Sequence, residues 1–374
     1  MTTPIHRSGR SGPRPRPVPR PRPRRPRDGG PRARVRGLGE VAAIVPYLLG
    51  FRPHESIVVL GMHGRDVGLT ARVDLPAALE PGWSDPLDDA LTAIAFHGAD
   101  RVNVLVASEA DALDPALLDE LRDLVGLAGL ELGDVGWQRG TRCLPLLDRA
   151  EGEPGGWLPV DTACQAVAAA AFAGAVALPS REDVEAEFER PPGTDPDRLL
   201  PFLLTEEDQA LADTLLAIDR IAGVRGRPEG GAAPHARLPR VLHTATSVLA
   251  AARAHDACVA EGRAPAPLTD AEVAGLVVAL ADVTVRDAAW TALDAGEVDG
   301  RGLWLELAHR APPPYDAAPL FLLGWRWWRR GDLLRARLAA ERAARVPGGY
   351  SAARLLLDAV SSCVDPATIP RLRA

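Results

Sequence analysis

A mixed α/β domain followed by an all-helical domain is the fold class that this sequence predicts, with a disordered tail in front of both. Three observations lead to it. Residues 1–36 alternate Pro and Arg. From residue 37 to about 180, strand-like and helix-like patterns alternate, and beyond Pro191 only helix-like periods follow. The predicted boundaries are 1–36 for the tail, 37–180 for the mixed sheet domain and 195–374 for the helical domain.

The charge distribution separates the tail from the rest of the chain. Residues 1–36 contain twelve Arg and one acid, Asp28, whereas the 374-residue chain as a whole carries a net charge of −7. The body is therefore acidic, and phosphate contacts need a basic surface. Nucleic acid is an expected partner only if the Arg-rich tail is a genuine part of the protein.

Three interpretations of the tail remain open. Pro removes backbone donors and Arg repels Arg, so the segment cannot build a core. It is a disordered arm that binds nucleic acid or acidic surfaces, a polyproline-II ligand for a partner, or upstream DNA translated from a wrongly chosen start codon. The abrupt beginning of patterned sequence near Val35 favours the third.

The elements of the α/β domain follow in order. A short helix with a proline inside it comes first, and the next segment, SIVVLGM, is apolar at almost every position and therefore predicts a central strand. The loop HGRD then closes a hairpin onto VGLTARVDL, which alternates apolar and polar residues. Because crossover helices follow this hairpin, the sheet is expected to be mixed. The predicted helices are 38–49, 86–95 and 115–128, and the predicted strands are 56–62, 67–75, 101–107 and two short strands within 133–147.

The second half predicts helices only. A Thr-x-x-Glu capping box at Thr269 marks the beginning of one of them. The Ala-rich run from Ala163 to Leu178 is too short to span a bilayer and is expected to be a buried helix, so no membrane partner is predicted. The predicted helices of this half are 197–223, 238–262, 269–282, 284–294 and 301–310.

The cysteines predict neither disulfides nor a metal site. They lie at positions 143, 164, 258 and 363, with no Cys-x-x-Cys pair among them. This spacing, in a chain with no signal-peptide pattern, predicts a reducing, cytoplasmic location.

Several segments carry a family resemblance. VPYLLGFRPHESIVVLG, then VGLTARVDLP, then the helical stretches LVVALADVTVRDAA and APPPYDAAPLFLLGWRWWRRGD resemble the domain-of-unknown-function family 4192 of high-GC Gram-positive bacteria. The resemblance runs from about Arg36 to the C-terminus and implies no activity and no cofactor. Many relatives carry a Cys-Cys-Pro stretch where this chain keeps only Cys143, so no metal or redox role is expected there.

Residues 317–350 are similar to one tetratricopeptide repeat. Small residues such as Gly324 and Ala336 stand where two helices would cross, with Trp327 between them and a Gly-Asp turn following. Two interpretations stay open: a helical hairpin packed on its own domain, or a peptide-binding groove in which Trp327 contacts a protein partner. Trp325 and Trp328 have the spacing of core residues.

The arginines beside these tryptophans, at positions 326, 329 and 330, are expected on a solvated face, where they stack on the rings.

No strong catalytic motif is present. The chain has no Gly-x-Gly-x-x-Gly opening a helix, no P-loop, no nucleophile elbow and no paired histidines. We therefore expect no cofactor and a non-catalytic, cytoplasmic interaction protein whose helical domain contacts a protein partner.

The alternative function is an enzyme or a small-anion-binding protein with a polar site at the end of the first hairpin. If the HGRD loop pairs Met62 with Val67, then Ile57 lies opposite Arg72 and Glu55 opposite Asp74. Arg72 would then bridge the two carboxylates, either as a structural ion pair or as the base of an anion pocket. His54 and Ser56 are adjacent to Glu55 and complete the set of candidate ligand-binding residues.

Overall fold

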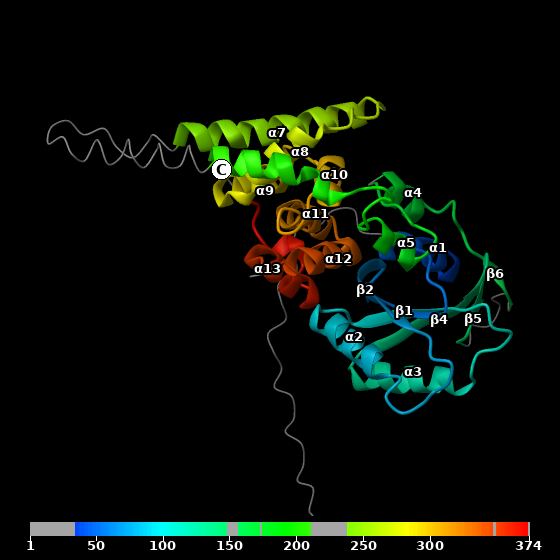
Figure 1. The fold of residues 1–374 in the computed structure, drawn as a ribbon. Helices are drawn as coiled ribbons and strands as arrows, with labels where there is room; N and C mark the ends of the chain where they lie inside the picture. The colour runs from blue at the N-terminus through cyan, green and yellow to red at the C-terminus, as the bar shows by residue number, and fades with distance from the viewer. Residues whose placement is uncertain (1–33, 148–155, 173, 211–237, 347–348, 373–374) are drawn as a thin grey trace, which may run out of the picture.

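The computed structural model describes residues 34–147, 156–172, 174–210, 238–346 and 349–372. It consists of an N-terminal half built on a β-sheet and a C-terminal half made of helices, joined by the segment that contains helix α5, Arg181–Ala186 (Figure 1). Apart from its last three residues, the predicted tail at 1–36 lies outside the described residues.

The sheet has six strands in the order β2-β1-β3-β4-β5-β6. β3 and β4 pair in parallel and every other neighbouring pair is antiparallel, which confirms the predicted mixed sheet. The strands are β1 (Ser56–His63), β2 (Asp66–Asp74), β3 (Arg101–Ala107), β4 (Glu131–Arg139), β5 (Arg142–Pro145) and β6 (Leu158–Pro159).

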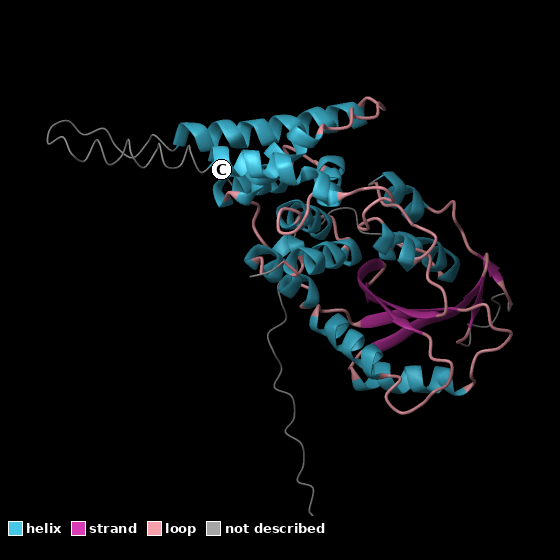
Figure 2. Ribbon diagram, viewed as in Figure 1, coloured by secondary structure: helices cyan, strands magenta, loops and turns pink. Residues whose placement is uncertain are grey.

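Helices cover both faces of this sheet (Figure 2). The crossover helices α2 (Asp85–Phe96) and α3 (Ala116–Leu127) pack on one face, and α1 (Leu38–Leu49) and α4 (Gln165–Phe172) pack on the other. β1 is buried on both faces: Val58 belongs to the core on the α1 side, and Ile57 to the core on the α2 side. The predicted central strand is therefore confirmed.

The register of the first hairpin differs from the prediction beyond its first two pairs. Met62 lies opposite Val67 as expected, but a bulge then places Leu60 opposite Thr70. Two glycines permit the bulge, because an added Cβ would meet Ile94 at 2.8 Å from Gly61 and the His63 ring at 3.0 Å from Gly68.

The bulge places each residue of β2 from Thr70 to Asp74 on the face of the sheet opposite to the one predicted. Arg72 lies opposite Val58 instead of Ile57, and Asp74 lies opposite Ser56 instead of Glu55. Because Val58 belongs to the core on the α1 side, Arg72 is on the α1 side of the sheet.

The helical half has one continuous core around Trp304, Phe321 and Trp328. The capping box is confirmed: Thr269 Oγ1 accepts a hydrogen bond from the Glu272 amide at 3.3 Å, and Glu272 accepts one from the Thr269 amide at 2.8 Å. The elements are a 3-10 turn at Pro196–Leu199, a helix at 200–210, α7 (Leu238–Ala260), α8 (Asp270–Ala281), α9 (Val283–Ala295), α10 (Arg301–Arg310), α11 (Ala317–Arg329), α12 (Leu333–Ala344), α13 (Ser351–Ser361) and a 3-10 turn at Pro366–Thr368. The predicted end of the 197–223 helix lies outside the described residues.

The Ala-rich run does not form the long buried helix that was predicted. Helix α4 covers only Gln165–Phe172, and Phe172 at its end is 96% exposed. Gly174 adopts φ +81°, and the backbone of Leu178 then bonds to Gly50, so the chain leaves the helix to reach α1. Among the described residues, no helix combines the length and apolarity that a membrane crossing requires.

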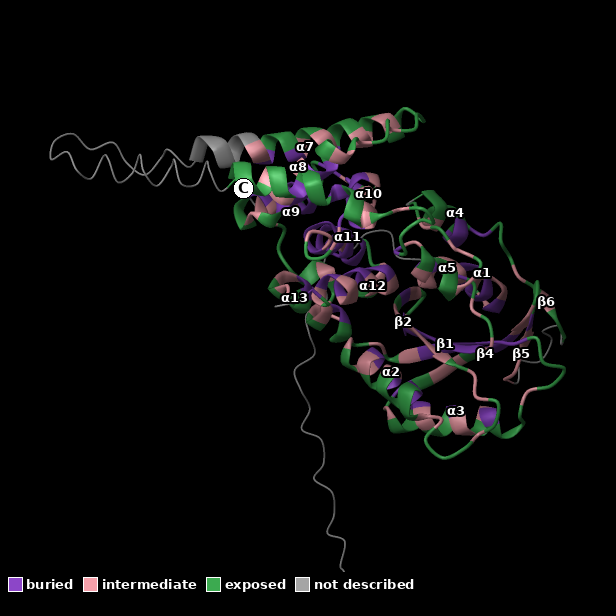
Figure 3. Ribbon diagram, viewed as in Figure 1, coloured by how far each residue is buried: buried purple, intermediate pink, exposed green. Residues whose placement is uncertain are grey.

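Two of the three arginines beside the tryptophans are not on the predicted solvated face, whereas the side chain of Arg330 is 53% exposed and pairs with Asp299 at 2.6 Å. Arg326 is 9% exposed and binds Asp299 through two hydrogen bonds, at 2.7 and 2.8 Å. Arg329 pairs at 2.5 Å with Asp294, whose side chain is fully buried, and its guanidinium lies over the Trp325 ring at 5.0 Å. The predicted stacking is thus present, but inside the helical half, because Asp294 on α9 and Asp299 in the loop before α10 supply the partners. Figure 3 shows how deeply α11 is buried.

Candidate functional site

Arg72 holds the loop in front of β1 in place. Its Nε donates to Ser56 Oγ at 2.8 Å, and its Nη1 pairs with Asp74 at 2.5 Å. The Ser56 hydroxyl donates to the His54 carbonyl at 2.6 Å, and Arg72 Nη2 approaches the same carbonyl at 3.5 Å. The predicted ion pair between Arg72 and Asp74 is confirmed. The buried hydroxyl of Ser56 is a further partner of Arg72 that the predicted register missed.

Glu55 belongs to a different cluster. Its backbone adopts φ +38°, and its carboxylate accepts hydrogen bonds from the Ser108 hydroxyl at 2.8 Å and the Glu109 amide at 3.0 Å, beyond the end of β3. The predicted bridge between Glu55 and Arg72 is therefore wrong, because the bulge puts the two side chains on opposite faces. His54 is exposed, and the side chain of Asp74 is 84% exposed.

Trp327, the predicted protein-binding residue, is buried. It is 4% exposed, and its ring packs against Phe188 with the centroids 5.3 Å apart. Its face of α11 is covered by the segment that follows α5, so Trp327 belongs to the core and not to an accessible groove.

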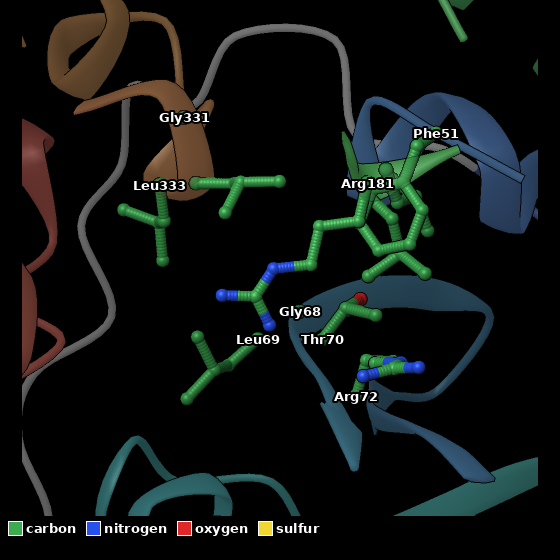
Figure 4. Close-up of a pocket in the computed structure, with 11 residues that line it drawn as sticks. Phe51, Gly68, Leu69, Thr70, Arg72, Arg181, Gly331 and Leu333 are labelled. Carbon is green, nitrogen blue, oxygen red and sulfur yellow. The ribbon is translucent and has the colours of Figure 1, made fainter. Parts of the chain in front are cut away.

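A cleft opens where β2 faces α5 and the beginning of α12 (Figure 4). We call it the hairpin cleft. Its volume is about 270 Å³, close to the lower end of the range for small-molecule sites. Two guanidinium groups and one hydroxyl are its polar side chains. The lining residues are Leu48, Leu49, Phe51, Gly68, Leu69, Thr70, Arg72, Arg181, Gly331, Leu333 and Leu334.

The hydroxyl of Thr70 lacks a partner in this cleft. Its Oγ1 is buried and makes no hydrogen bond with any residue that the structure describes. A buried hydroxyl left unpaired costs about 1–3 kcal/mol. A ligand that exchanges a hydrogen bond with Thr70 would remove this cost.

The two arginines give the cleft a positive wall. Arg181 extends from α5 toward β2, where Thr70 and Arg72 lie (Figure 4). Arg181 pairs with Glu185 at 2.9 Å and Arg72 pairs with Asp74, but neither carboxylate lines the cleft. Each guanidinium carries five N–H donors, so both keep donors for a ligand.

The charges of Arg181 and Arg72 also contribute to the pKa of the neighbouring Glu182. The pKa of Glu182 is lowered, first by the hydrogen bond from its own backbone amide, next by the Ser180 hydroxyl, and further by the charges of Arg181 and Arg72. The charges of both guanidiniums therefore act on the same exposed carboxylate, but less than its hydrogen bonds do.

Sequence reasoning missed Arg181, Thr70 and Leu333. Arg181 follows Ser180, whose side chain makes a capping box with Asp183, so a local signal marks the start of α5. No local signal shows that α5 and α12 lie beside the hairpin, because those contacts are long-range.

The fold and this cleft define a class: a mixed α/β sheet in the N-terminal half followed by a helical C-terminal half, with a cleft lined by two arginines and apolar residues between them. Among the described residues, no group of three His, Cys, Asp or Glu side chains is placed to hold a metal ion. A family model described as "Domain of unknown function (DUF4192)" matches residues 39–367, and the chain belongs to that family. No curated protein and no solved structure matches the chain.

Proposed function

We propose that the protein is a non-catalytic binding protein that takes a small organic anion with an apolar body into the hairpin cleft. The observation that carries this proposal is the convergence of Arg72, Arg181 and the unpartnered hydroxyl of Thr70 on one apolar cavity. It develops the small-anion alternative that the sequence left open around Arg72.

The chemistry of the lining supports binding. Guanidinium groups bind carboxylate and phosphate oxygens through paired, charge-assisted hydrogen bonds. The leucines and Phe51 offer a surface for an aliphatic or aromatic body. The lining includes no carboxylate, imidazole or thiol that would serve as a general base or nucleophile, which supports a role without catalysis.

A calorimetric titration with acetate, hexanoate, inorganic phosphate and hexylamine tests the proposal. Hexanoate is expected to bind more tightly than acetate, because its chain contacts the leucines, and hexylamine is expected not to bind. Arg181→Ala should weaken hexanoate binding about tenfold or more. Arg122→Ala is the matched control, since Arg122 lies on α3, pairs only with Asp119 among the described residues and is 48% exposed.

The variant Thr70→Val provides a second, independent test of the proposal. The free protein loses no hydrogen bond among its described residues, so stability should be unchanged or higher, while anion binding should weaken. Anion binding that is indifferent to both Arg181→Ala and Thr70→Val would refute the proposal.

We also propose that α11 and α12 form a tetratricopeptide-like unit that serves a protein partner. In support, a Cβ on Gly324 would meet Ala339 Cβ at 3.3 Å and Leu356 at 2.9 Å, so a small residue stands where these helices cross. On the neighbouring α13, Leu355 is 70% exposed. A cytoplasmic location and an origin in high-GC Gram-positive bacteria belong to the same proposal, supported by the cysteine spacing and the Arg-, Ala- and Pro-rich composition.

Affinity capture from the native host tests the partner. Leu355→Arg should abolish capture of the partner. Leu127→Arg, an equally drastic change at an 82% exposed leucine on α3, should leave it intact. Equal loss in both variants, or in neither, would contradict a partner on the helical half.

A further inference from the structure

A second cleft lies at the other end of α12 and shares no residue with the hairpin cleft. We call it the Asp316 cleft. Its volume is about 260 Å³, and it lies between the segment after α5, the loop joining α10 to α11, and the end of α12. The lining residues are Phe188, Arg190, Ala308, Pro313, Asp316, Leu320, Arg342, Arg345 and Val346.

Asp316 gives the cleft a carboxylate with one unpaired oxygen. Its Oδ1 is buried and has no hydrogen-bond partner among the described residues. Its Oδ2 lies 4.0 Å from Arg190 Nη2, which is too long for a hydrogen bond. Burial raises the pKa of Asp316, against the charge of Arg190, a hydrogen bond from its own backbone amide and the charge of Arg342. The carboxylate is therefore desolvated, and a hydrogen-bond donor beside it would relieve that cost.

Arg190 and Arg342 are engaged with backbone oxygens. Arg190 donates to the carbonyls of His309 and Ala311, at 3.2 and 2.8 Å, and Arg342 donates to the carbonyl of Phe188. Desolvation lowers the pKa of Arg342, and the charges of Arg345 and Arg190 lower it further.

Arg345 makes no side-chain hydrogen bond or ion pair with any described residue. The cleft thus contains three guanidiniums against one carboxylate, and one of the guanidiniums has all its donors available.

The remaining walls are apolar. Phe188 and Leu320 are buried, and Ala308, Pro313 and Val346 complete the surface. A simple anion would place its charge against Asp316, and a simple cation would face three arginines. A ligand with an ammonium and a carboxylate on neighbouring atoms satisfies both sides, and an aliphatic side chain on it would contact the apolar walls.

We propose that the Asp316 cleft binds a free α-amino acid with an aliphatic side chain, its ammonium on Asp316 and its carboxylate on Arg345 and Arg342. This site shares no lining residue with the hairpin cleft.

Titration of the full chain with L-leucine tests this site. N-acetyl-L-leucine removes the ammonium, L-leucinamide removes the carboxylate, and glycine removes the aliphatic side chain. L-leucine is expected to raise the melting temperature and to bind at least tenfold more tightly than any of the three analogues. This series needs no variant, so it holds whatever a substitution does to folding.

Two variants test which residues bind the ammonium and the carboxylate of L-leucine. Asp316→Asn and Arg345→Gln should each weaken L-leucine binding about tenfold or more. Arg337→Ala should not weaken it, because Arg337 lies on α12 outside the cleft and its guanidinium pairs with Glu341. Arg181→Ala should leave it unchanged too, which separates this site from the hairpin cleft.

The proposal is overturned if L-leucine does not bind. It is also overturned if N-acetyl-L-leucine binds as well as L-leucine, which would indicate an anion site, or if L-leucinamide does, which would indicate a cation site. Binding that persists unchanged in both Asp316→Asn and Arg345→Gln would place the amino acid elsewhere and refute it as well.

Discussion

Replacing Arg72 with Ala tests the bulged register directly, because the register decides which residue Arg72 is coupled to. The variant loses the 2.8 Å hydrogen bond to Ser56, a residue that is fully buried, while the Arg72 side chain is 17% exposed. A hydrogen bond to a charged group contributes about 1.5–3 kcal/mol. The pair with Asp74 adds at most about 1 kcal/mol, because that carboxylate is 84% exposed. We expect Arg72→Ala to lower the free energy of unfolding by about 2–3 kcal/mol.

Two double-mutant cycles, followed by urea unfolding at neutral pH, separate the possible partners. Arg72→Ala combined with Ser56→Ala should show a coupling energy of about 1–2 kcal/mol, because the two residues share a hydrogen bond. Arg72→Ala combined with Glu55→Gln should be additive within about 0.5 kcal/mol, because Glu55 bonds to Ser108 instead.

The reverse pattern would refute this reasoning. A coupling to Glu55 larger than the coupling to Ser56 would mean that the hairpin pairs without the bulge. In that case Thr70 and Arg72 would also leave the hairpin cleft.

Three further outcomes are expected. Asp294→Asn should cost about 3–5 kcal/mol in urea unfolding, because it leaves Arg329 buried without its counter-charge; a loss below about 1 kcal/mol would contradict this. Deleting residues 1–33 should leave the melting temperature unchanged, whereas a deletion that also removes Val35, which is 5% exposed, should lower it. Burial lowers the pKa of His309, so the fold favours its neutral form: the stability it contributes is present above about pH 6.5 and is lost as the pH falls. Melting curves at pH 7.5 and 5.5 should therefore show a smaller acid loss in His309→Gln, and an identical loss would refute the assignment.

The elements that the sequence predicted well are those whose signal is local. β1 is apolar at nearly every position, and the structure buries it on both faces. The bulge was missed because Gly61 and Gly68 permit it without requiring it, and one inserted residue reverses the face of every side chain beyond it. The burial of Arg326 was missed because its counter-ion, Asp299, lies on a different part of the helical half and an arginine-rich stretch carries no sign of its partner.

The candidate site was only partly predictable for the same reason. Arg72 was identified because alternation along β2 is a local pattern. Arg181 comes from the segment between the two halves, and its place beside β2 depends on tertiary packing that no spacing rule encodes. Trp327 was misassigned because helical periodicity shows which residues share a face, but not which segment covers that face.

Helix α12 has a mechanical consequence for the two clefts. Leu333 and Leu334 at its beginning line one cleft, and Arg342 and Arg345 lie at the other. Its twelve residues span about 18 Å and form a stiff rod between them. The segment 181–190 runs between the same two clefts, and Glu187 in it pairs with Arg335 in the first turn of α12 at 2.6 Å. Helix α12 and the segment 181–190 therefore each connect the two proposed binding sites. If an occupant of one cleft changes the dissociation constant at the other, thermodynamic reciprocity requires the reverse effect to have the same factor.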